Sequence, residues 1–308
     1  MESIYIANIM KKEKCDLHCH AARGAGIEYI NKIINRKIVE KQRFHSINEM
    51  DKWFINNIEA YFNGKEGYEL LIHATIKQAI EDNVKYLELS FSIERVKLYD
   101  YSIEAFIESI RNIIRQYSDI NIIPEIAVPK TSDYKRNIYY AKESLDYNFF
   151  RSVDIVGEEL EIDFENFKEL YRIARKKRLR LRAHVGEFGS AESIRQTCDL
   201  LELDEVQHGI HASDSLEVIQ YLRNNKIQLN ICPTSNVRMG IVENYNNHPI
   251  RKLYNMGIIV TINTDDRLIF NHSVTEEYLE LLKHNVFSVY ELDNIRATTI
   301  KRCQELWK

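Results

Sequence analysis

Short apolar runs alternate with longer segments of helical periodicity along almost the whole chain, and this alternation limits the possible folds most. The apolar runs lie at 15–18, 84–91, 120–128, 152–156, 179–184, 205–208, 227–231 and 258–263. Apolar residues spaced three and four apart predict helices at 69–81, 103–117, 164–177, 191–201, 214–224, 248–256, 274–284 and 288–306. Most of the predicted strands recur at roughly 25–35 residues, the period of a βα barrel. We therefore predict an α/β fold, a (β/α)8 TIM barrel, with a doubly wound open sheet as the alternative.

The domain organisation follows from the length and the connections. The chain has 308 residues and no Gly-, Ser- or Pro-rich linker, which favours one barrel domain over 1–308. The connection between the first two predicted strands holds roughly 65 residues, far more than a usual connection. It carries helical patches at 26–35 and 48–61. Because an insertion after the first strand lies at the barrel mouth, we predict a helical lid over about 22–66.

Composition narrows the classes of partner. A net charge of −4 disfavours a nucleic-acid-binding surface, and no apolar stretch is long enough to span a membrane. Residues 1–5 lack the basic and apolar regions of a secretory signal. The cysteines form no Cys-x-x-Cys pair and indicate reduced thiols: Cys15, Cys19, Cys198, Cys232 and Cys303. These features predict a cytoplasmic protein.

Polar residues that can bind a metal end several of the predicted strands. In a barrel, the carboxyl ends of all strands converge on one mouth, where the active site lies. His18 and His20 are two residues apart, so an extended chain directs both imidazoles to the same side. With His184 and Asp265 they form a set of three imidazoles and one carboxylate, which suits Zn²⁺.

Several segments together resemble the ordered motifs of the adenosine deaminase family in the metal-dependent amidohydrolase superfamily. They are Asp16-Leu17-His18-Cys19-His20, His184-Val185-Gly186-Glu187, His208-Gly209-Ile210-His211, Cys232-Pro233-Thr234-Ser235-Asn236, His248-Pro249-Ile250-Arg251-Lys252-Leu253 and Thr264-Asp265-Asp266. The resemblance runs in order from about residue 14 to the last helix. It implies a TIM barrel that hydrolyses adenosine or 2′-deoxyadenosine to the inosine product and ammonia, a reaction of purine salvage. The implied partner is a small purine nucleoside or base.

The resemblance also implies roles for individual residues. One Zn²⁺ per chain would be bound by His18, His20, His184 and Asp265. Glu187 would protonate purine N1, and His208 would be the base that orients the metal-bound water and helps to deprotonate it. Asp266 would hydrogen-bond N7, and the backbone N–H of Gly157 would meet N3.

Elementary chemistry agrees with these roles. Zn²⁺ lowers the pKa of bound water from about 15.7 to about 7, which supplies a nucleophile at neutral pH. An acid is needed to protonate the ring, and such a carboxyl group needs a raised pKa. Asp265 and Asp266 are adjacent, and a pair of carboxylates favours keeping one protonated, here as a donor to N7.

One departure from the family pattern bears on the substrate. The residue that holds the ribose 5′-hydroxyl is an aspartate in typical members, and Ala22 stands at that position here. The alternative substrates are therefore adenine or a 5′-modified or N6-methylated adenosine or AMP. A binuclear barrel hydrolase is disfavoured because Val156-Gly157-Glu158 holds no bridging lysine. A non-catalytic barrel binding protein is disfavoured because Glu187, His208 and the ligand set are all present.

Overall fold

Eight parallel strands form one barrel in the computed structural model, which describes residues 9, 11–131, 133–159 and 163–307. They pair in chain order: β1 (Lys14–His20), β2 (Val84–Ser92), β3 (Asn121–Pro129), β4 (Ser152–Val156), β5 (Arg180–Val185), β6 (Glu205–His208), β7 (Gln228–Ile231) and β8 (Ile259–Ile262). Just beyond β8, Asp265 closes the circle: its N–H donates to the His18 carbonyl at 2.8 Å, and its carbonyl accepts from His20 N–H at 3.3 Å. The predicted TIM barrel is confirmed, and the open sheet is wrong.

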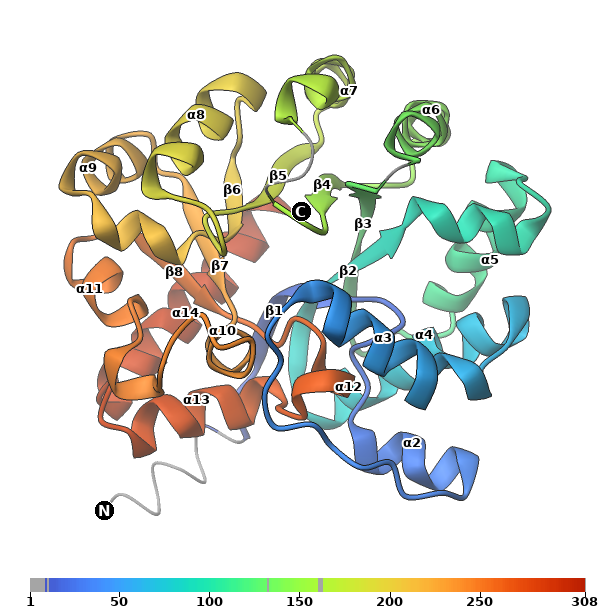
Figure 1. Ribbon diagram of the computed structural model, residues 1–308, viewed down its shortest axis with the longest axis horizontal. Coiled ribbons are helices and arrows are strands. Elements are labelled where there is room, and N and C mark those ends of the chain that lie inside the picture. Colours follow the sequence, from blue (N-terminus) through green and yellow to red (C-terminus); the bar gives the residue numbers. More distant parts are fainter. Residues whose placement is uncertain (1–8, 10, 132, 160–162, 308) are drawn as a thin grey trace.

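Helices surround the strands (Figure 1). They are α2 (Ile27–Ile34), α3 (Ile47–Asn57), α4 (Gly64–Glu81), α5 (Ile103–Ile114), α6 (Tyr134–Ser144), α7 (Lys168–Lys176), α8 (Ala191–Leu201), α9 (Leu216–Asn224), α10 (Pro233–Arg238), α11 (Ile250–Asn255), α12 (Arg267–Phe270), α13 (Val274–Lys283) and α14 (Val289–Leu306). The 3₁₀ segments η1 (Glu59–Tyr61), η2 (Ile93–Tyr99) and η5 (Ile210–Asp214) also bear on the site or its surroundings. Apolar side chains of strands and helices form one continuous core between the two layers.

The sequence did not predict three of these helices. On α6 the buried residues are Asn137, Ala141 and Ser144, so the helix has no apolar stripe to show its period. Helices α10 and α12 have six and four residues, which is too short to show a 3.6-residue period.

The long connection after β1 is helical, as predicted. Ser46 caps α3 by accepting a hydrogen bond from Glu49 N–H at 3.1 Å. Phe44 and Phe54 of the connection pack in one apolar cluster with Phe270 of α12. Figure 1 shows α3 in front of β1 and β2. The connection is therefore packed against the chain that leaves β8, at the mouth of the barrel.

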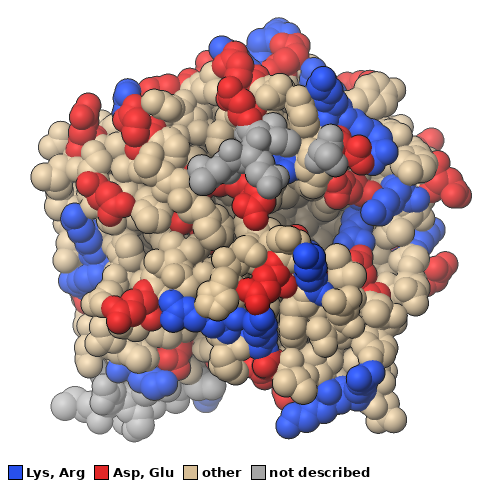
Figure 2. Space-filling view, viewed as in Figure 1, with Lys and Arg blue, Asp and Glu red and all other residues tan. Residues whose placement is uncertain are grey.

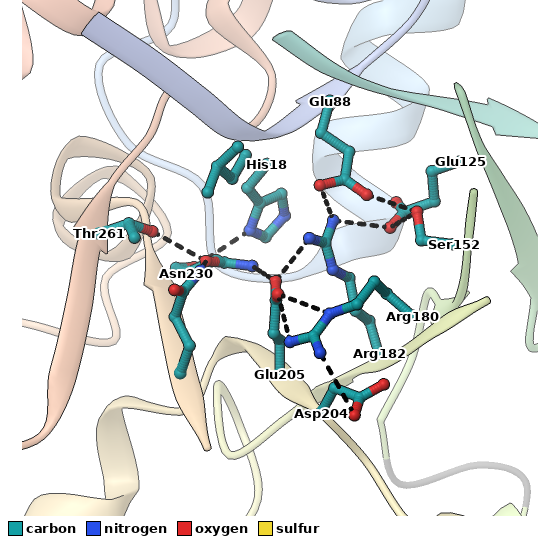
Figure 3. Close-up of polar contacts among 12 residues, drawn as sticks. His18, Glu88, Glu125, Ser152, Arg180, Arg182, Asp204, Glu205, Asn230 and Thr261 are labelled. Atoms are coloured by element: carbon teal, nitrogen blue, oxygen red, sulfur yellow. Dashed lines mark hydrogen bonds and ion pairs between the residues drawn. The ribbon is translucent and has the colours of Figure 1, made fainter. Parts of the chain in front are cut away.

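A buried ionic cluster fills the barrel interior beneath the strand ends. Figure 3 shows Arg182 of β5 among three carboxylates. Its guanidinium contacts Glu88 of β2, lies 3.1 Å from Glu125 Oε2 of β3 and lies 2.5 Å from Glu205 Oε2 of β6. All four side chains are 1% exposed. Asn230 of β7 donates to Glu205 at 3.0 Å, so the cluster joins five strands across the barrel.

The carboxylates of this cluster differ in acidity. Burial raises the pKa of Glu88 to about 8 and that of Glu125 to about 7. Burial also acts on Glu205, but Arg182 and Arg180 outweigh it and lower the pKa of Glu205 to about 2. Glu205 is therefore the carboxylate that balances the arginines.

Two surface properties bear on partners. On the face shown in Figure 2, acidic and basic side chains are interspersed, and neither sign forms a continuous patch. Within the described residues, none of the helices combines the length and apolar character needed to cross a bilayer. Residues 1–5, where the sequence shows no secretory signal, lie outside the described residues.

Candidate active site

A cavity of about 250 Å³ opens where the strands end. Seven of the predicted site residues line it, namely His20, Gly157, His184, Glu187, His208, Asp265 and Asp266. The remaining one, His18, lies beneath the cavity and is 2% exposed. The structure thus brings all predicted site residues to one place, which is the mouth that the barrel architecture favours.

The predicted metal ligands fall in two overlapping groups, one of which also includes His208, the predicted base. In one group His18, His20 and Asp265 have ligand atoms within 4.8 Å of one another, and in the other His18 joins His184 and His208. His18 Nε2 lies 3.0 Å from His184 Nε2, and His20 Nε2 lies 3.4 Å from Asp265 Oδ1. A third group of His208, Cys232 and Asp265 includes a cysteine that the sequence did not single out as a ligand.

Contacts behind the ligands fix their orientation. His18 Nδ1 lies 3.2 Å from the Asn230 carbonyl, and His184 Nδ1 lies 2.8 Å from Asp154 Oδ2. The Asn230 carbonyl can accept only from Nδ1–H, so neutral His18 has Nε2 free, the form that binds a metal. Asp154 of β4 is fully buried.

The electrostatics of this group suit a cation. Burial opposes ionisation of His20, yet the carboxylates of Asp266 and Asp265 outweigh it and raise the pKa of His20 to about 9. Burial and His20 lower the pKa of His184 to about 3. Although burial opposes it, contacts with His20 and His18 hold the pKa of Asp265 below its usual range. His18 and His184 are thus neutral near pH 7, and Asp265 is ionised. The carboxylates around His20 favour a positive charge there, which a divalent cation could supply.

Glu187 follows β5 and is 7% exposed. Burial, and then the carboxylates of Asp265 and Glu159, hold the pKa of Glu187 well above its usual range. Its Oε2 lies 3.6 Å from His208 Nε2. A carboxyl group with a raised pKa in a cavity is suited to act as a general acid.

Glu159 fixes the segment that carries Glu187. Its Oε1 accepts from Gly186 N–H at 2.6 Å, and its Oε2 accepts from the N–H groups of Glu187, Phe188 and Gly189 at 3.2, 2.9 and 2.9 Å. A Cβ at Gly189 would lie 2.2 Å from Glu159 Oε1, so only glycine allows this close approach. One buried carboxylate thus satisfies four successive backbone donors.

A chain of hydrogen bonds determines the tautomer of His208. Ile250 N–H donates to His248 Nδ1 at 3.1 Å, so the proton of neutral His248 is on Nε2. That proton faces Asn236 Oδ1 at 3.3 Å, which leaves Asn236 Nδ2 to donate to His208 Nδ1 at 3.1 Å. Burial and the nearby His18 hold the pKa of His208 well below its usual range. Neutral His208 therefore carries its proton on Nε2, on the side of Glu187 and Asp265.

Backbone strain coincides with two of these residues. His208 has φ of 61° and Asp265 has φ of 60°, a left-handed conformation that residues other than glycine seldom adopt. Such strain is concentrated at functional sites in proteins. Gly157, after β4, has φ of 96° and lines the cavity, which suits its predicted role through the backbone.

Asp266 forms an ion pair that the sequence did not predict. Its Oδ2 lies 2.9 Å from Arg23 Nη1, and Arg23 Nη2 lies 2.8 Å from Asp51 of α3. The Arg23 guanidinium also lies 4.4 Å from the ring centre of Phe54. Burial raises the pKa of Asp266, although Arg23 opposes this shift. Asp266 Oδ1 is buried and accepts no hydrogen bond from the described residues.

Several other histidines, and Cys19, lie elsewhere. None of His45, His73, His211, His272 and His284 lines the cavity, and neither does Cys19. Conversely, sequence reasoning did not assign roles to Asp154, Glu159 and Asn236. Asn236 ends the motif Cys232-Pro233-Thr234-Ser235-Asn236, and Glu159 directly follows Val156-Gly157-Glu158. The sequence therefore draws attention to both regions, but it does not indicate the long-range contacts of these two residues.

Comparisons with known proteins agree with this architecture. Residues 33–304 match the family described as Adenosine deaminase. A putative adenosine/adenine deaminase of Treponema pallidum is 32% identical over 213 residues, which cover 69% of this chain and 71% of the relative.

Solved structures show the same fold. An adenine deaminase from Arthrobacter aurescens is 22% identical with a TM-score of 0.80, covering 94% of this chain and 92% of its own. A zinc-bound amidohydrolase from Burkholderia ambifaria is 19% identical with a TM-score of 0.76, covering 94% and 85%. The chain belongs to the adenosine deaminase family and is a hydrolytic deaminase.

Proposed function

We propose that this enzyme converts adenosine and 2′-deoxyadenosine, with water, into inosine and 2′-deoxyinosine and ammonia. The observation that carries the proposal is the placement of Glu187. A buried carboxyl group with a raised pKa lies in the same cavity as a histidine–aspartate set suited to a divalent cation. Ring protonation at N1 and water activation at the neighbouring C6, the two needs of aminopurine hydrolysis, are thereby met within one small site.

We propose one Zn²⁺ per chain as the cofactor, held by His18, His20, His184 and Asp265. The imidazoles and the carboxylate are the ligand types that Zn²⁺ prefers, and the field that raises the pKa of His20 favours a positive charge there. When bound, zinc would lower the pKa of a coordinated water and so make it a nucleophile near neutral pH. The zinc-bound amidohydrolase of the same fold supports this choice of metal.

The remaining roles follow from the positions of the protons. Glu187 holds a proton that it can deliver to purine N1. His208 presents Nε2–H, so we propose that it donates to the attacking water and orients it, in place of the base role that the family resemblance implies. Asp266 Oδ1 would bind N7, and the raised pKa of this carboxyl group suits a donor. Gly157 N–H would bind N3.

We propose that the segment 22–66 acts as a lid. Ile47, Met50 and Asp51 line the cavity together with residues of the strand ends. Arg23 connects Asp51 of α3 to Asp266, so closure of this segment and placement of the N7 partner depend on the same guanidinium. A covered site would exclude bulk water from the reacting atoms.

The charges of the cavity favour a substrate without phosphate. Within the described part of the chain, the arginines that line it are Arg23 and Arg95. Arg23 pairs with Asp51 and Asp266, and Arg95 pairs with Glu59 of η1. A nucleotide would have to compete with these carboxylates for the guanidinium groups, whereas a neutral nucleoside or base would not.

Adenine is the second candidate substrate. Ala22 lines the cavity, so β1 offers no carboxylate to a ribose 5′-hydroxyl. A free base needs no such partner.

The test is release of ammonia from adenosine, 2′-deoxyadenosine, adenine, 5′-methylthioadenosine and AMP, and of methylamine from N6-methyladenosine, by the purified zinc-loaded protein. We expect the highest kcat/KM for the first two. A preference of tenfold or more for AMP would contradict the proposal, and a preference of that size for adenine would support the second candidate instead.

A further inference from the structure

The contacts proposed for the purine define where a ribose would lie. Glu187 follows β5, Gly157 follows β4 and Asp266 follows β8, so N1, N3 and N7 would face these strand ends. In a purine, N9 lies between N3 and N7 on the perimeter, opposite N1. The strands follow one another in chain order around the barrel. Between β4 and β8 the mouth therefore has two sides: β5, β6 and β7 form one, and β1, β2 and β3 form the other. The ribose would therefore extend toward the ends of β1, β2 and β3.

On this side of the cavity the carboxylate that remains available is Glu94. The described carboxylates that line the cavity are Asp51, Glu94, Glu187, Asp265 and Asp266. Asp51 is paired with Arg23, and the last three have roles in the metal site or toward the purine ring. No described Lys, Arg or His lies within ion-pair distance of Glu94. Its charge is therefore neither balanced by a cation nor used by the proposed chemistry.

Glu94 is also held in a defined orientation. It stands in η2, directly after β2, and its Oε1 accepts from Thr131 Oγ1 at 2.9 Å and from Asn137 Nδ2 at 3.0 Å. Asn137 is itself fixed, because the same amide donates to the Pro129 carbonyl at 3.1 Å. No described residue donates to Oε2. One oxygen thus orients the group, and the other receives no donor from the described residues, so a substrate hydroxyl could supply one.

We infer that Glu94 is a specificity-determining residue that accepts a hydrogen bond from a ribose hydroxyl of the substrate. This inference rests on the proposed function, since it needs a purine in the orientation given above. It places directly after β2 the carboxylate that is missing after β1, where Ala22 stands. A half-buried carboxylate oxygen without a donor gains a charge-assisted hydrogen bond from a nucleoside, and a free base cannot supply one.

The experiment compares Glu94→Ala with the unchanged enzyme, both zinc-loaded, on adenosine, adenine and the 5′-, 3′- and 2′-deoxyadenosines. We expect kcat/KM for adenosine to fall about 10- to 100-fold, the range of a hydrogen bond to a charged group. For adenine we expect less than about a threefold change. Glu94→Gln keeps one amide oxygen and should lose less than Glu94→Ala. The matched control is Glu108→Ala on α5, whose carboxylate pairs with Arg111 at 2.7 Å away from the cavity.

The unchanged enzyme provides a measurement that does not depend on the variant folding. At least one deoxyadenosine should show the same 10- to 100-fold loss, and Glu94→Ala should add no further loss on that analogue. Equal losses on adenosine and adenine, no loss on adenosine, or no discrimination among the deoxyadenosines would each overturn the inference. If adenine or adenosine is deaminated while Glu94→Ala behaves like the control, the inference fails and the proposed function stands. If no aminopurine releases ammonia, the proposed function fails and this inference with it.

Discussion

Glu159→Gln tests whether catalysis depends on the carboxylate that orders the segment after β5. The glutamate accepts four backbone hydrogen bonds, three of them on Oε2. A glutamine can keep its oxygen at the Oε2 position, but its NH2 group then faces Gly186 N–H. We expect about 1 kcal/mol lost on each of the three retained bonds, because they are no longer charge-assisted, and about 1–3 kcal/mol for the unpaired Gly186 donor.

The cost falls on the segment that positions Glu187, so activity should fall together with stability. A displaced general acid costs on the order of 10- to 100-fold in kcat, while KM should change less than about threefold, because Gly157 and Asp266 make the other proposed purine contacts. Steady-state ammonia release measures kcat and KM, and urea unfolding measures the free energy of unfolding. The expected loss of stability is about 4–6 kcal/mol.

A matched control is Glu192→Gln on α8, an exposed glutamate that pairs with Arg195 at 2.5 Å, which should leave both quantities nearly unchanged. Gly189→Ala provides an independent variant, since its Cβ would lie 2.2 Å from Glu159 Oε1. The reasoning is refuted if Glu159→Gln retains kcat within threefold, or if its only kinetic effect is on KM.

Three further predictions follow from the same contacts. His184→Ala should lose bound metal and more than 99% of activity (about 10²-fold) with an unchanged far-UV spectrum; retention of one tightly bound zinc would exclude His184 as a ligand. Glu187→Gln should keep zinc and purine binding but lose at least about 10²-fold in kcat, because an amide cannot protonate N1; a near-normal kcat would assign the acid role to another residue. Glu205→Gln should lower the free energy of unfolding by about 3–5 kcal/mol at pH 7, because it leaves Arg182 short of a buried partner. Since the folded pKa of Glu205 is about 2, below its ordinary value of 4.5, this contribution is present above pH 4.5 and is lost as the pH falls toward 2. The difference in urea midpoint between Glu205→Gln and the unchanged protein should therefore shrink on acidification, and a constant difference would contradict the assignment.

The barrel could be predicted because its signal is local. Each strand is a short apolar run bounded by helical periodicity. His18 and His20 end β1 and Asp265 follows β8, and these residue types already indicate a metal. The alternating direction of side chains in a strand was enough to place His18 and His20 together. Helix α6 lacked such a signal because it buries polar and small residues.

The contacts that orient the site could not be predicted because they join segments distant in the sequence. Glu159 binds the backbone at 186–189, and the sequence there records this only as Gly189, which leaves room for the carboxylate. Arg23 pairs with Asp266, which lies 243 residues further along the chain, so the sequence around Arg23 does not indicate this contact. Glu94 gave no sequence signal, since its significance depends on its neighbours across β3 and α6 and on what Ala22 fails to supply.

The most direct test of the central proposal, aminopurine deamination at a single metal site, is zinc titration of the metal-free enzyme. Ammonia release from adenosine would be measured at each step, with bound zinc determined by elemental analysis. The proposal predicts negligible activity without metal, a linear rise, and a plateau at one zinc per chain. Activity in the metal-free protein, or a plateau only at two zinc ions per chain, would contradict it.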